Sequence, residues 1–188
     1  TEPEIFGAGE WLNTSIYMLT PDAALDGGST YSVTVGAGLT AVDGAVLSEP
    51  FTWTFETLPP QILSIQPSDN QRNVLLDQDI VMRFSQPMER DSTTDAFNLL
   101  FQGQRIQGEF SWNDDDTILT FTPSGNLAID STFLLNIADT AQSKSGEATL
   151  DRGYSQSFST VPFPGVERTS PSNGETDVRP GGGASIQF

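Results

Sequence analysis

The chain contains neither cysteine nor histidine among its 188 residues. Without cysteine it can form no disulfide framework, no thiolate nucleophile and no cysteine-based metal site. Without histidine it lacks the commonest general base and the commonest nitrogen ligand of metals. Basic residues are also scarce, because eight lysines and arginines face 25 acids and give a formal net charge of −17. We expect such a chain to bind no nucleic acid and its charge to serve solubility.

Long apolar runs are absent as well. No apolar run approaches the ~20 residues that a membrane-spanning helix needs, so we expect no membrane insertion. The sequence shows no signal peptide, and we expect any signal or anchor to lie outside these residues.

The dominant positive feature is an internal repeat of about one hundred residues. The segment MLTPDAALDGGSTYSVTV (residues 18–35) aligns with TFTPSGNLAIDSTFLLNI (residues 120–137) at an offset of 102. A second pair, PSDNQRNVLLDQDIVMRF (residues 67–84) and PSNGETDVRPGGGASIQF (residues 171–188), aligns at an offset of 104. A period of this length corresponds to one domain per repeat, because solenoid units are much shorter.

The two alignments predict three regions along the chain. Residues 1–58 correspond to the C-terminal part of a first repeat, 59–161 to a complete repeat, and 162–188 to the N-terminal part of a third. The proline-containing joints TLPPQI (residues 57–62) and TVPFPGV (residues 160–166) separate them. Proline fixes φ and pushes its predecessor to an extended conformation, so both joints are predicted to be short and stiff.

Apolar residues alternate with polar ones throughout, which is the pattern of half-buried β-strands. In FTWTFET, Phe51, Trp53 and Phe55 fall on one face, which we expect to point inward. The complete repeat is predicted to form a β-sandwich of about seven strands. The expected helical content is one or two turns in RDSTTDAFNLL, with Asp91 or Ser92 as N-cap. The predicted core of the complete repeat comprises Ile80, Met82, Phe84, Leu119, Phe121, Phe133, Leu135, Ile137 and Phe158.

An ordered set of motifs adds a family resemblance. The complete repeat has a P-S-x-N loop, then FSQPM (residues 84–88), LTFTP (residues 119–123), an L-x-x-x-S-T-F segment (residues 127–133) and a closing FST (residues 158–160). This set resembles the bacterial Ig-like domain of S-layer proteins and other large bacterial surface proteins. The resemblance implies an all-β fold, with Ig-like β-sandwich repeats in tandem, one complete and two partial, and an extracellular or cell-surface location.

Similar tandem domains occur in bacterial alpha-2-macroglobulin-like proteins, which trap proteases. The C-terminal segment PGVERTSPSNGETDVRPGGGASIQF (residues 164–188) is similar to the repeats of those proteins. Their reactive thioester requires a cysteine. If the parent protein is of this kind, the resemblance implies that the present repeats are not its reactive domain.

The acidic run Asp114, Asp115 and Asp116 is the sharpest local candidate for a metal site. Calcium needs several converging oxygen ligands, and three consecutive carboxylates in a tight turn cannot all reach one ion. We therefore interpret the run as a hairpin turn, where Asn and Asp are favoured. Asp43 is another loop acid, but its counterpart in the complete repeat is Ser145. A ligand role shared by both repeats is therefore not expected.

Catalytic arrangements are equally unsupported by the sequence. No pair among the 25 acids stands in an apolar setting, as glycoside hydrolysis requires of its general acid. Serine nucleophiles lack a histidine base, and Lys144 lies in the polar loop QSKSGE, which gives it no reason to lose its proton. The glycines of PGGG (residues 180–183) lack the G-K-[ST] ending of a phosphate loop and are read as a turn.

Aromatic residues and methionine are interpreted as packing residues. Trp53 belongs to the alternating strand described above, while Trp11 and Trp112 occupy comparable places in the two repeats. A position used twice indicates a structural role, and Met88 after Pro87 is expected to fill the core. The sequence thus predicts no catalytic, cofactor-binding or metal-binding residue and no cofactor.

Two functions remain open at this point. The first is a non-catalytic Ig-like structural or spacer module of a large secreted or surface protein, whose partners are the neighbouring repeats of the same polypeptide. The alternative is a glycan- or protein-binding adhesion module that uses loops or exposed strand edges. We do not expect an enzyme. A further hypothesis is strand exchange between chains, in which residues 162–188 of one chain supply missing strands to residues 1–58 of the next. Its alternative is that the partial repeats are ordered only by looser packing.

Overall fold

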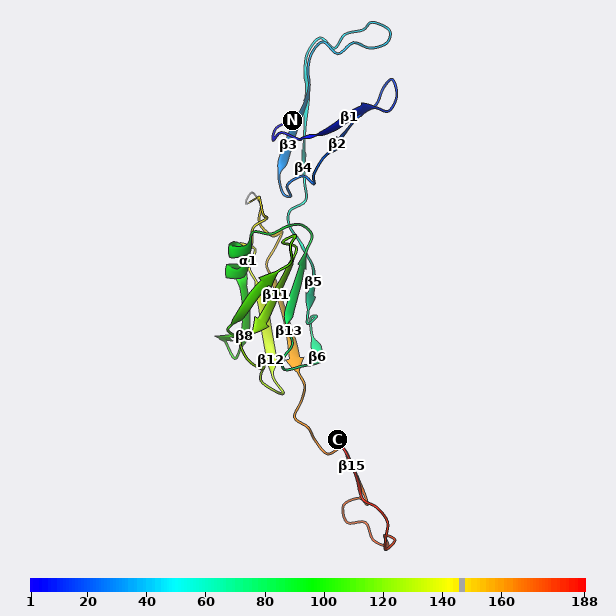
Figure 1. Cartoon of the computed structure of the whole chain (residues 1–188), viewed down its shortest axis with the longest axis vertical. Coiled ribbons are helices and arrows are strands. Elements are labelled where there is room, and N and C mark those ends of the chain that lie inside the picture. The colour runs from blue at the N-terminus through cyan, green and yellow to red at the C-terminus, as the bar shows by residue number, and fades with distance from the viewer. Residues whose placement is uncertain (146–147) are drawn as a thin grey trace.

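The computed structural model describes residues 1–145 and 148–188. Three regions follow one another along the long axis (Figure 1). We call residues 1–58 the head, 59–161 the middle repeat and 162–188 the tail. The head and the tail lie at opposite ends of the middle repeat.

The middle repeat is a β-sandwich of two sheets. One sheet has the strand order β10-β11-β7-β5, and the other has the order β6-β13-β12-β8-β9. All strand pairs are antiparallel except the parallel pair β6–β13. The strands are β5 (Ile62–Gln66), β6 (Gln71–Val74), β7 (Ile80–Phe84), β8 (Phe97–Phe101), β9 (Gln104–Arg105), β10 (Gly108–Trp112), β11 (Ile118–Pro123), β12 (Thr132–Ile137) and β13 (Tyr154–Thr160).

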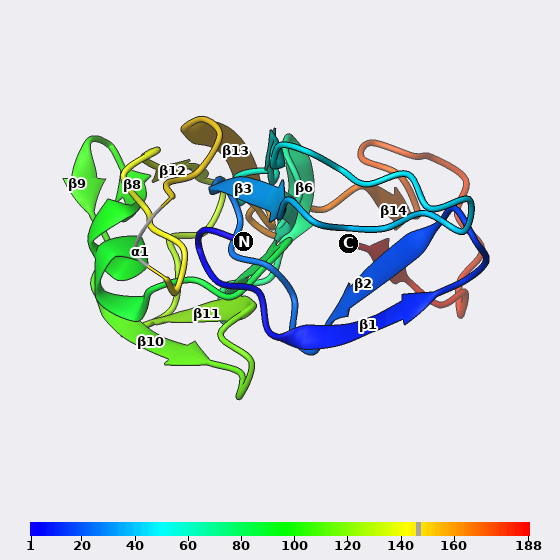
Figure 2. The same cartoon turned by 90° about the horizontal axis from the view of Figure 1, so that it is seen from above.

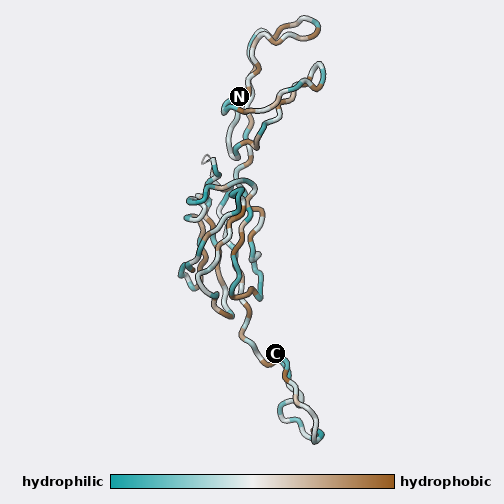
Figure 3. The backbone as a smooth tube through the Cα atoms, viewed as in Figure 1, coloured by the Kyte–Doolittle hydropathy of each residue, from teal (hydrophilic) through white to brown (hydrophobic). Residues whose placement is uncertain are grey.

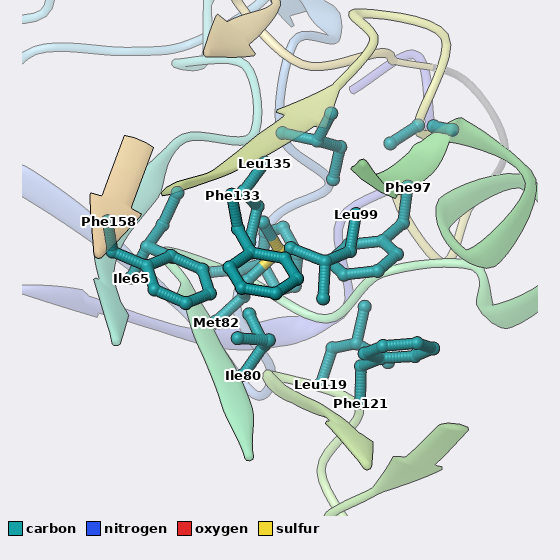
Figure 4. Packing of buried hydrophobic residues seen from close by; sticks show 14 of the residues in the cluster. Ile65, Ile80, Met82, Phe97, Leu99, Leu119, Phe121, Phe133, Leu135 and Phe158 are labelled. Atoms are coloured by element: carbon teal, nitrogen blue, oxygen red, sulfur yellow. The ribbon is translucent and has the colours of Figure 1, made fainter. Parts of the chain in front are cut away.

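The core of the middle repeat lies between these two sheets, as Figure 4 shows. All nine residues that the alternation predicts for the core are buried. Aromatic rings dominate the contacts: Phe133 stacks on Phe158 with centroids 5.4 Å apart, and Phe97 contacts Phe121 at 4.9 Å. Met88 is buried in the same cluster, so its interpretation as a core residue is confirmed. Buried aromatic area of this kind supplies most of the hydrophobic stabilisation of a small sandwich.

Two details of the middle repeat differ from the sequence prediction. The described residues form nine strands instead of about seven, because the short strands β6 and β9 extend the edges of one sheet. Helix α1 spans Arg90–Ala96, as expected, but its N-cap is Glu89 and not Asp91 or Ser92. The Glu89 carboxylate accepts hydrogen bonds from the backbone N–H groups of Asp91 and Ser92. It thus does what the shorter side chain of Ser, Thr, Asp or Asn usually does at an N-cap.

The head contains four strands that pair in the same way as β10 to β13 of the middle repeat. Strand β1 (Gly7–Trp11) pairs with β2 (Tyr17–Pro21), and β3 (Thr30–Val35) pairs with β4 (Phe51–Glu56). Gly7 lies opposite Pro21 just as Gly108 lies opposite Pro123. In the other hairpin Tyr31 lies opposite Phe55, and the corresponding middle-repeat pair is Phe133 and Phe158. Strands β1 to β4 are therefore the equivalents of β10 to β13.

The aromatic face of the head is exposed, which corrects the sequence interpretation. Trp53 is 43% exposed and Phe55 37%, although the alternation places them with Phe51 on an inward face. Trp11 is also exposed and meets the ring of Tyr17, whereas its counterpart Trp112 is half-buried against Phe84. The backbone pattern is correct, but no described segment lies over this face as β5 and β7 cover β13 and β12 in the middle repeat. Figure 3 shows the hydrophobic residues along the head.

The tail folds as a separate hairpin with the register of the front of the middle repeat. Strand β14 (Arg168–Ser170) pairs with β15 (Ser185–Gln187), and Thr169 lies opposite Ile186. The counterpart pair in β5 and β7 is Ile65 and Met82. The offset of 104 found in the sequence therefore holds for the strand pairing as well.

Candidate functional site

A buried carboxylate with two cations is the main electrostatic feature of the middle repeat. Asp116 ends the turn between β10 and β11, and its side chain is only 6% exposed. Arg90 Nε donates a hydrogen bond to Asp116 Oδ1 over 2.7 Å, and Lys144 Nζ donates to Oδ2. These hydrogen bonds, that from Lys144 first, hold the pKa of Asp116 below its usual value. The carboxylate is therefore ionised and neutralised by protein cations.

The Asp116 ion pairs connect three separate segments. Asp116 lies on the β10–β11 turn, Arg90 begins α1, and Lys144 lies on the hairpin before β13. The backbone adds to the connection, since Met88 N–H donates to Asp116 O and Lys144 N–H donates to Pro87 O, both over 2.9 Å. Both carboxylate oxygens of Asp116 are bound to cations, so the arrangement joins the three segments. The Asp116 carboxylate is therefore not available as an acid, base or nucleophile. Sequence reasoning missed it, because the three residues share no motif.

The acidic run itself has the geometry of a hairpin turn. Asn113 Oδ1 accepts the N–H groups of Thr117 and Ile118 over 2.9 and 2.8 Å, and Asp116 adopts a left-handed φ of 55°. Asp114 and Asp115 are exposed, whereas Asp116 is buried. In residues 1–145 and 148–188, no three acids, histidines or cysteines gather in a way that could hold a metal ion.

The remaining loop candidates take part in local turns. Asp43 Oδ1 accepts the N–H of Ala45 over 3.0 Å, and the hydroxyl of its counterpart Ser145 lies 2.9 Å from that of Ser143. The glycines of residues 180–183 form a turn before β15, where Gly182 N–H donates to Arg179 O over 3.0 Å. These local hydrogen bonds account for the conformations of Asp43, Ser145 and the glycine turn, so no bound ligand is needed to explain them.

The joint between the head and the middle repeat is closely packed. Gly28 N–H donates to Leu58 O over 2.9 Å, and the Thr57 hydroxyl donates to Asp26 O over 2.5 Å. A Cβ at Gly27 would lie 2.0 Å from Gln86 Oε1, and one at Gly28 would lie 2.5 Å from the Cβ of Ala148. The turn thus approaches the middle repeat more closely than residues with side chains would allow.

The joint between the middle repeat and the tail begins with the same hydrogen bonds. Asp130 N–H donates to Val161 O over 2.8 Å, and the Thr160 hydroxyl donates to Ala128 O over 2.7 Å. Asp130 shares the left-handed φ of Gly28, its counterpart. Each F-x-T strand end therefore sets the exit direction of the chain in the same way, through one backbone and one hydroxyl hydrogen bond.

An open cavity with a volume of about 960 Å³ lies in the head. Its walls are the β1–β2 turn with Trp11 and the hairpin between β3 and β4 with Leu39, Val42 and Leu47. Figure 2 shows both segments reaching to the same side of the head. In the middle repeat the equivalent hairpin contacts the start of α1, where Glu89 N–H donates to Gln142 O over 2.9 Å. The cavity therefore corresponds to the space that Met88 and α1 occupy in the middle repeat.

Comparison with known families agrees with this repeated architecture. The model of the bacterial Ig-like domain matches residues 7–57 and again residues 56–160. The chain belongs to the bacterial Ig-like domain family. The two matches are the head and the middle repeat described above, with β1 to β4 in the first and β5 to β13 in the second. A search of curated proteins found no match.

Solved structures that resemble part of this chain include CopC and parts of two much larger proteins. CopC from Methylosinus trichosporium OB3b is 15% identical with a TM-score of 0.46, and the match covers 57% of this chain and 98% of CopC. The S-layer protein SbsC is 13% identical with a TM-score of 0.40, covering 60% of this chain but 15% of SbsC. The alpha-2-macroglobulin of Escherichia coli is 16% identical with a TM-score of 0.42, covering 56% of this chain and 6% of that protein.

No helix in the described part of the chain has the length and hydropathy to cross a membrane.

Proposed function

We propose that the chain is a non-catalytic spacer of a large extracellular or cell-surface bacterial protein, in which Ig-like repeats follow one another in a defined direction. Its partners are then the neighbouring repeats of the same polypeptide. The parent protein that the motif resemblance favours is of the S-layer or macroglobulin-like kind. In this role the chain itself carries out no chemistry.

The packed joint at Gly27 and Gly28 is the observation that supports this proposal. A spacer must hold one repeat at a fixed angle to the next, whereas domains joined by a flexible linker move freely. Here the turn of the head lies against Gln86 and Ala148 of the middle repeat. The hydrogen bonds of Thr57 and Leu58 hold the preceding strand end to the same turn.

Electron-spin distance measurements between the head and the middle repeat test the proposal. The chain has no cysteine, so labels can be placed at Thr52→Cys in β4 and Leu134→Cys in β12, both exposed positions. We expect a narrow distance distribution. Gly27→Ala should broaden or shift it, because the new methyl group would meet Gln86.

Gly36→Ala is the matched control, because a Cβ at Gly36 has no neighbour within 4 Å. This variant should keep the distribution of the parent chain. A distribution as broad as that of a flexible linker in the parent chain would contradict a spacer of fixed geometry.

A glycan- or protein-binding role is the second candidate, and the exposed Trp11 in the wall of the head cavity favours it. Trp11 is exposed there beside Leu39 and Val42, and the ring of Tyr17 meets that of Trp11 edge to face. Aromatic faces bind sugars and peptides, so a glycan array with the parent chain and the Trp11→Ala variant separates the two candidates. Binding that is lost in the variant would support adhesion, whereas the absence of binding favours the spacer.

A further inference from the structure

We propose that the ion pairs of Asp116 fix the angle at which the middle repeat holds the head. The inference rests on the proposed spacer function, because it concerns the fixed geometry of the same joint. Helix α1, which begins at Arg90, lies at the end of the middle repeat that faces the head (Figure 1). The Asp116 carboxylate binds Arg90 and Lys144 at this end, and Lys144 belongs to a hairpin that contacts the head. Asp116 is therefore a positioning residue of the joint.

Two segments of the middle repeat form the surface that receives the head. One is residues 86–87, which follow β7, and the other is the hairpin between β12 and β13. A cleft of about 330 Å³ lies between these segments and the turn of the head. Its walls include Asp26 and Gly27 of the head and Gln86, Pro87 and Lys144 of the middle repeat. The angle of the head therefore depends on the positions of both segments.

Asp116 holds both of these segments. Lys144 Nζ donates to Asp116 Oδ2, which fixes the hairpin. Met88 N–H donates to Asp116 O over 2.9 Å, which fixes the end of the segment that contains Pro87. The two segments are also joined to each other, since Lys144 N–H donates to Pro87 O over 2.9 Å. The Asp116 side chain is 6% exposed, so its carboxylate has little access to water and depends on the two cations for compensation of its charge.

The hairpin passes the position of Lys144 on to the head. Ser143, the neighbour of Lys144, donates its N–H to Ala148 O over 2.7 Å, and Ala148 N–H donates to Ser143 Oγ over 3.3 Å. Ala148 in turn lies against Gly28, where an added Cβ would come within 2.5 Å of the Ala148 Cβ. A displacement of Lys144 therefore reaches Gly28 through two directly bonded or packed neighbours.

The other cation of the pair provides the contrast. Arg90 binds the same carboxylate from α1, and in the described part of the chain it is not among the residues that line the joint cleft. Helix α1 is joined to the base of the hairpin, where Glu89 N–H donates to Gln142 O over 2.9 Å. Removing Arg90 leaves Lys144 on Asp116, whereas removing Lys144 releases the part of the hairpin that contacts the head. The two cations carry equal charge but have different effects on the joint.

Electron-spin distance measurements between Thr52→Cys in β4 and Leu134→Cys in β12 test the proposal. Lys144→Met removes the cation but keeps an unbranched side chain of similar length. We expect this variant to broaden or shift the distance distribution between the head and the middle repeat, because the hairpin loses its contact with Asp116. Lys144→Arg should restore the distribution of the parent chain, since a guanidinium group binds the same carboxylate.

Arg90→Met is the matched control, because it also removes one cation from Asp116 but leaves the hairpin attached. A second label pair, Thr122→Cys and Leu134→Cys, lies at exposed positions within the middle repeat and should keep its distribution in every variant.

Three results would overturn the proposal. The first is a Lys144→Met chain with the head-to-middle distribution of the parent chain, and the second is an equal change in Arg90→Met. The third is a change in the distances within the middle repeat of Lys144→Met, because the effect would then not be confined to the joint. A broad head-to-middle distribution already in the parent chain would contradict the spacer function as well, so the two failures are distinguishable.

Discussion

One aromatic pair occurs in two different surroundings. It consists of Phe133 and Phe158 in the middle repeat and of Tyr31 and Phe55 in the head. The rings stack with centroids 5.4 and 5.5 Å apart, and their strands pair in the same register. Phe158 is nevertheless 1% exposed, whereas Phe55 is 37% exposed. The hairpin geometry is therefore local to the strands that form it. Burial depends on the front strands β5 and β7 in the middle repeat, and no described segment takes their place over the pair in the head.

The comparison predicts that equivalent truncations will have unequal costs. Phe121→Ala in β11 should lower the free energy of unfolding of the middle repeat by roughly 3–5 kcal/mol, because it opens a cavity in a closed core. Leu19→Ala at the equivalent position of β2 should cost less than about 1 kcal/mol, because Leu19 is already exposed. Urea unfolding followed by tryptophan fluorescence measures the first effect in a Trp11→Phe, Trp53→Phe background, where the remaining tryptophan is Trp112, which stacks on Phe84. Equal costs for both variants would show that the head face is covered.

A second prediction concerns the Asp116 ion pairs, because the head has Thr14 where the middle repeat has Asp116. The folded pKa of Asp116 lies below its ordinary value of 3.8. Its contribution to stability is therefore present above that value and is lost as the pH falls through the folded pKa. Asp116→Asn should lower the melting temperature at pH 7 and reduce the difference between pH 7 and pH 3.

Asp114→Asn provides the control for the same measurement. Asp114 is exposed on the same turn, and the described residues show no ion pair to it. Its substitution should change the melting temperature little at either pH. If the two variants gave the same pH profile, the ion pairs of Asp116 would not contribute to stability.

Sequence reasoning was strongest where a property depends on neighbouring residues along the chain. Period-two alternation identified the core of the middle repeat, including Phe84 and Phe121, because a strand alternates its side chains between two faces. The same pattern was misleading for Trp53, because alternation identifies the apolar face but not whether another sheet covers it. The assignment of Glu89 as N-cap was missed because glutamate rarely takes this position.

Features that join distant segments could not be read from the sequence. The two cations on Asp116 lie 26 and 28 residues away, and nothing in their spacing indicates contact. Likewise, nothing in the sequence around Gly27 and Gly28 indicates their close approach to Gln86 and Ala148. A one-dimensional pattern specifies strands and turns, whereas these contacts depend on how the strands are packed.

The smallest expected effect concerns calcium, and it tests whether the acids of the two regions differ in ion binding. In the middle repeat Asp116 is already bound by Arg90 and Lys144, and in the head Asp43 accepts a backbone N–H. A site that binds calcium only in the folded state would raise stability with the logarithm of ligand concentration over Kd. We therefore expect the melting temperature to stay within about 1 °C when 1 mM calcium replaces EDTA at constant ionic strength, on that relation. Magnesium at the same concentration controls for general screening of the 25 acids. A rise of many degrees that is specific to calcium and lost in Asp115→Asn would contradict the interpretation of residues 114–116 as a turn.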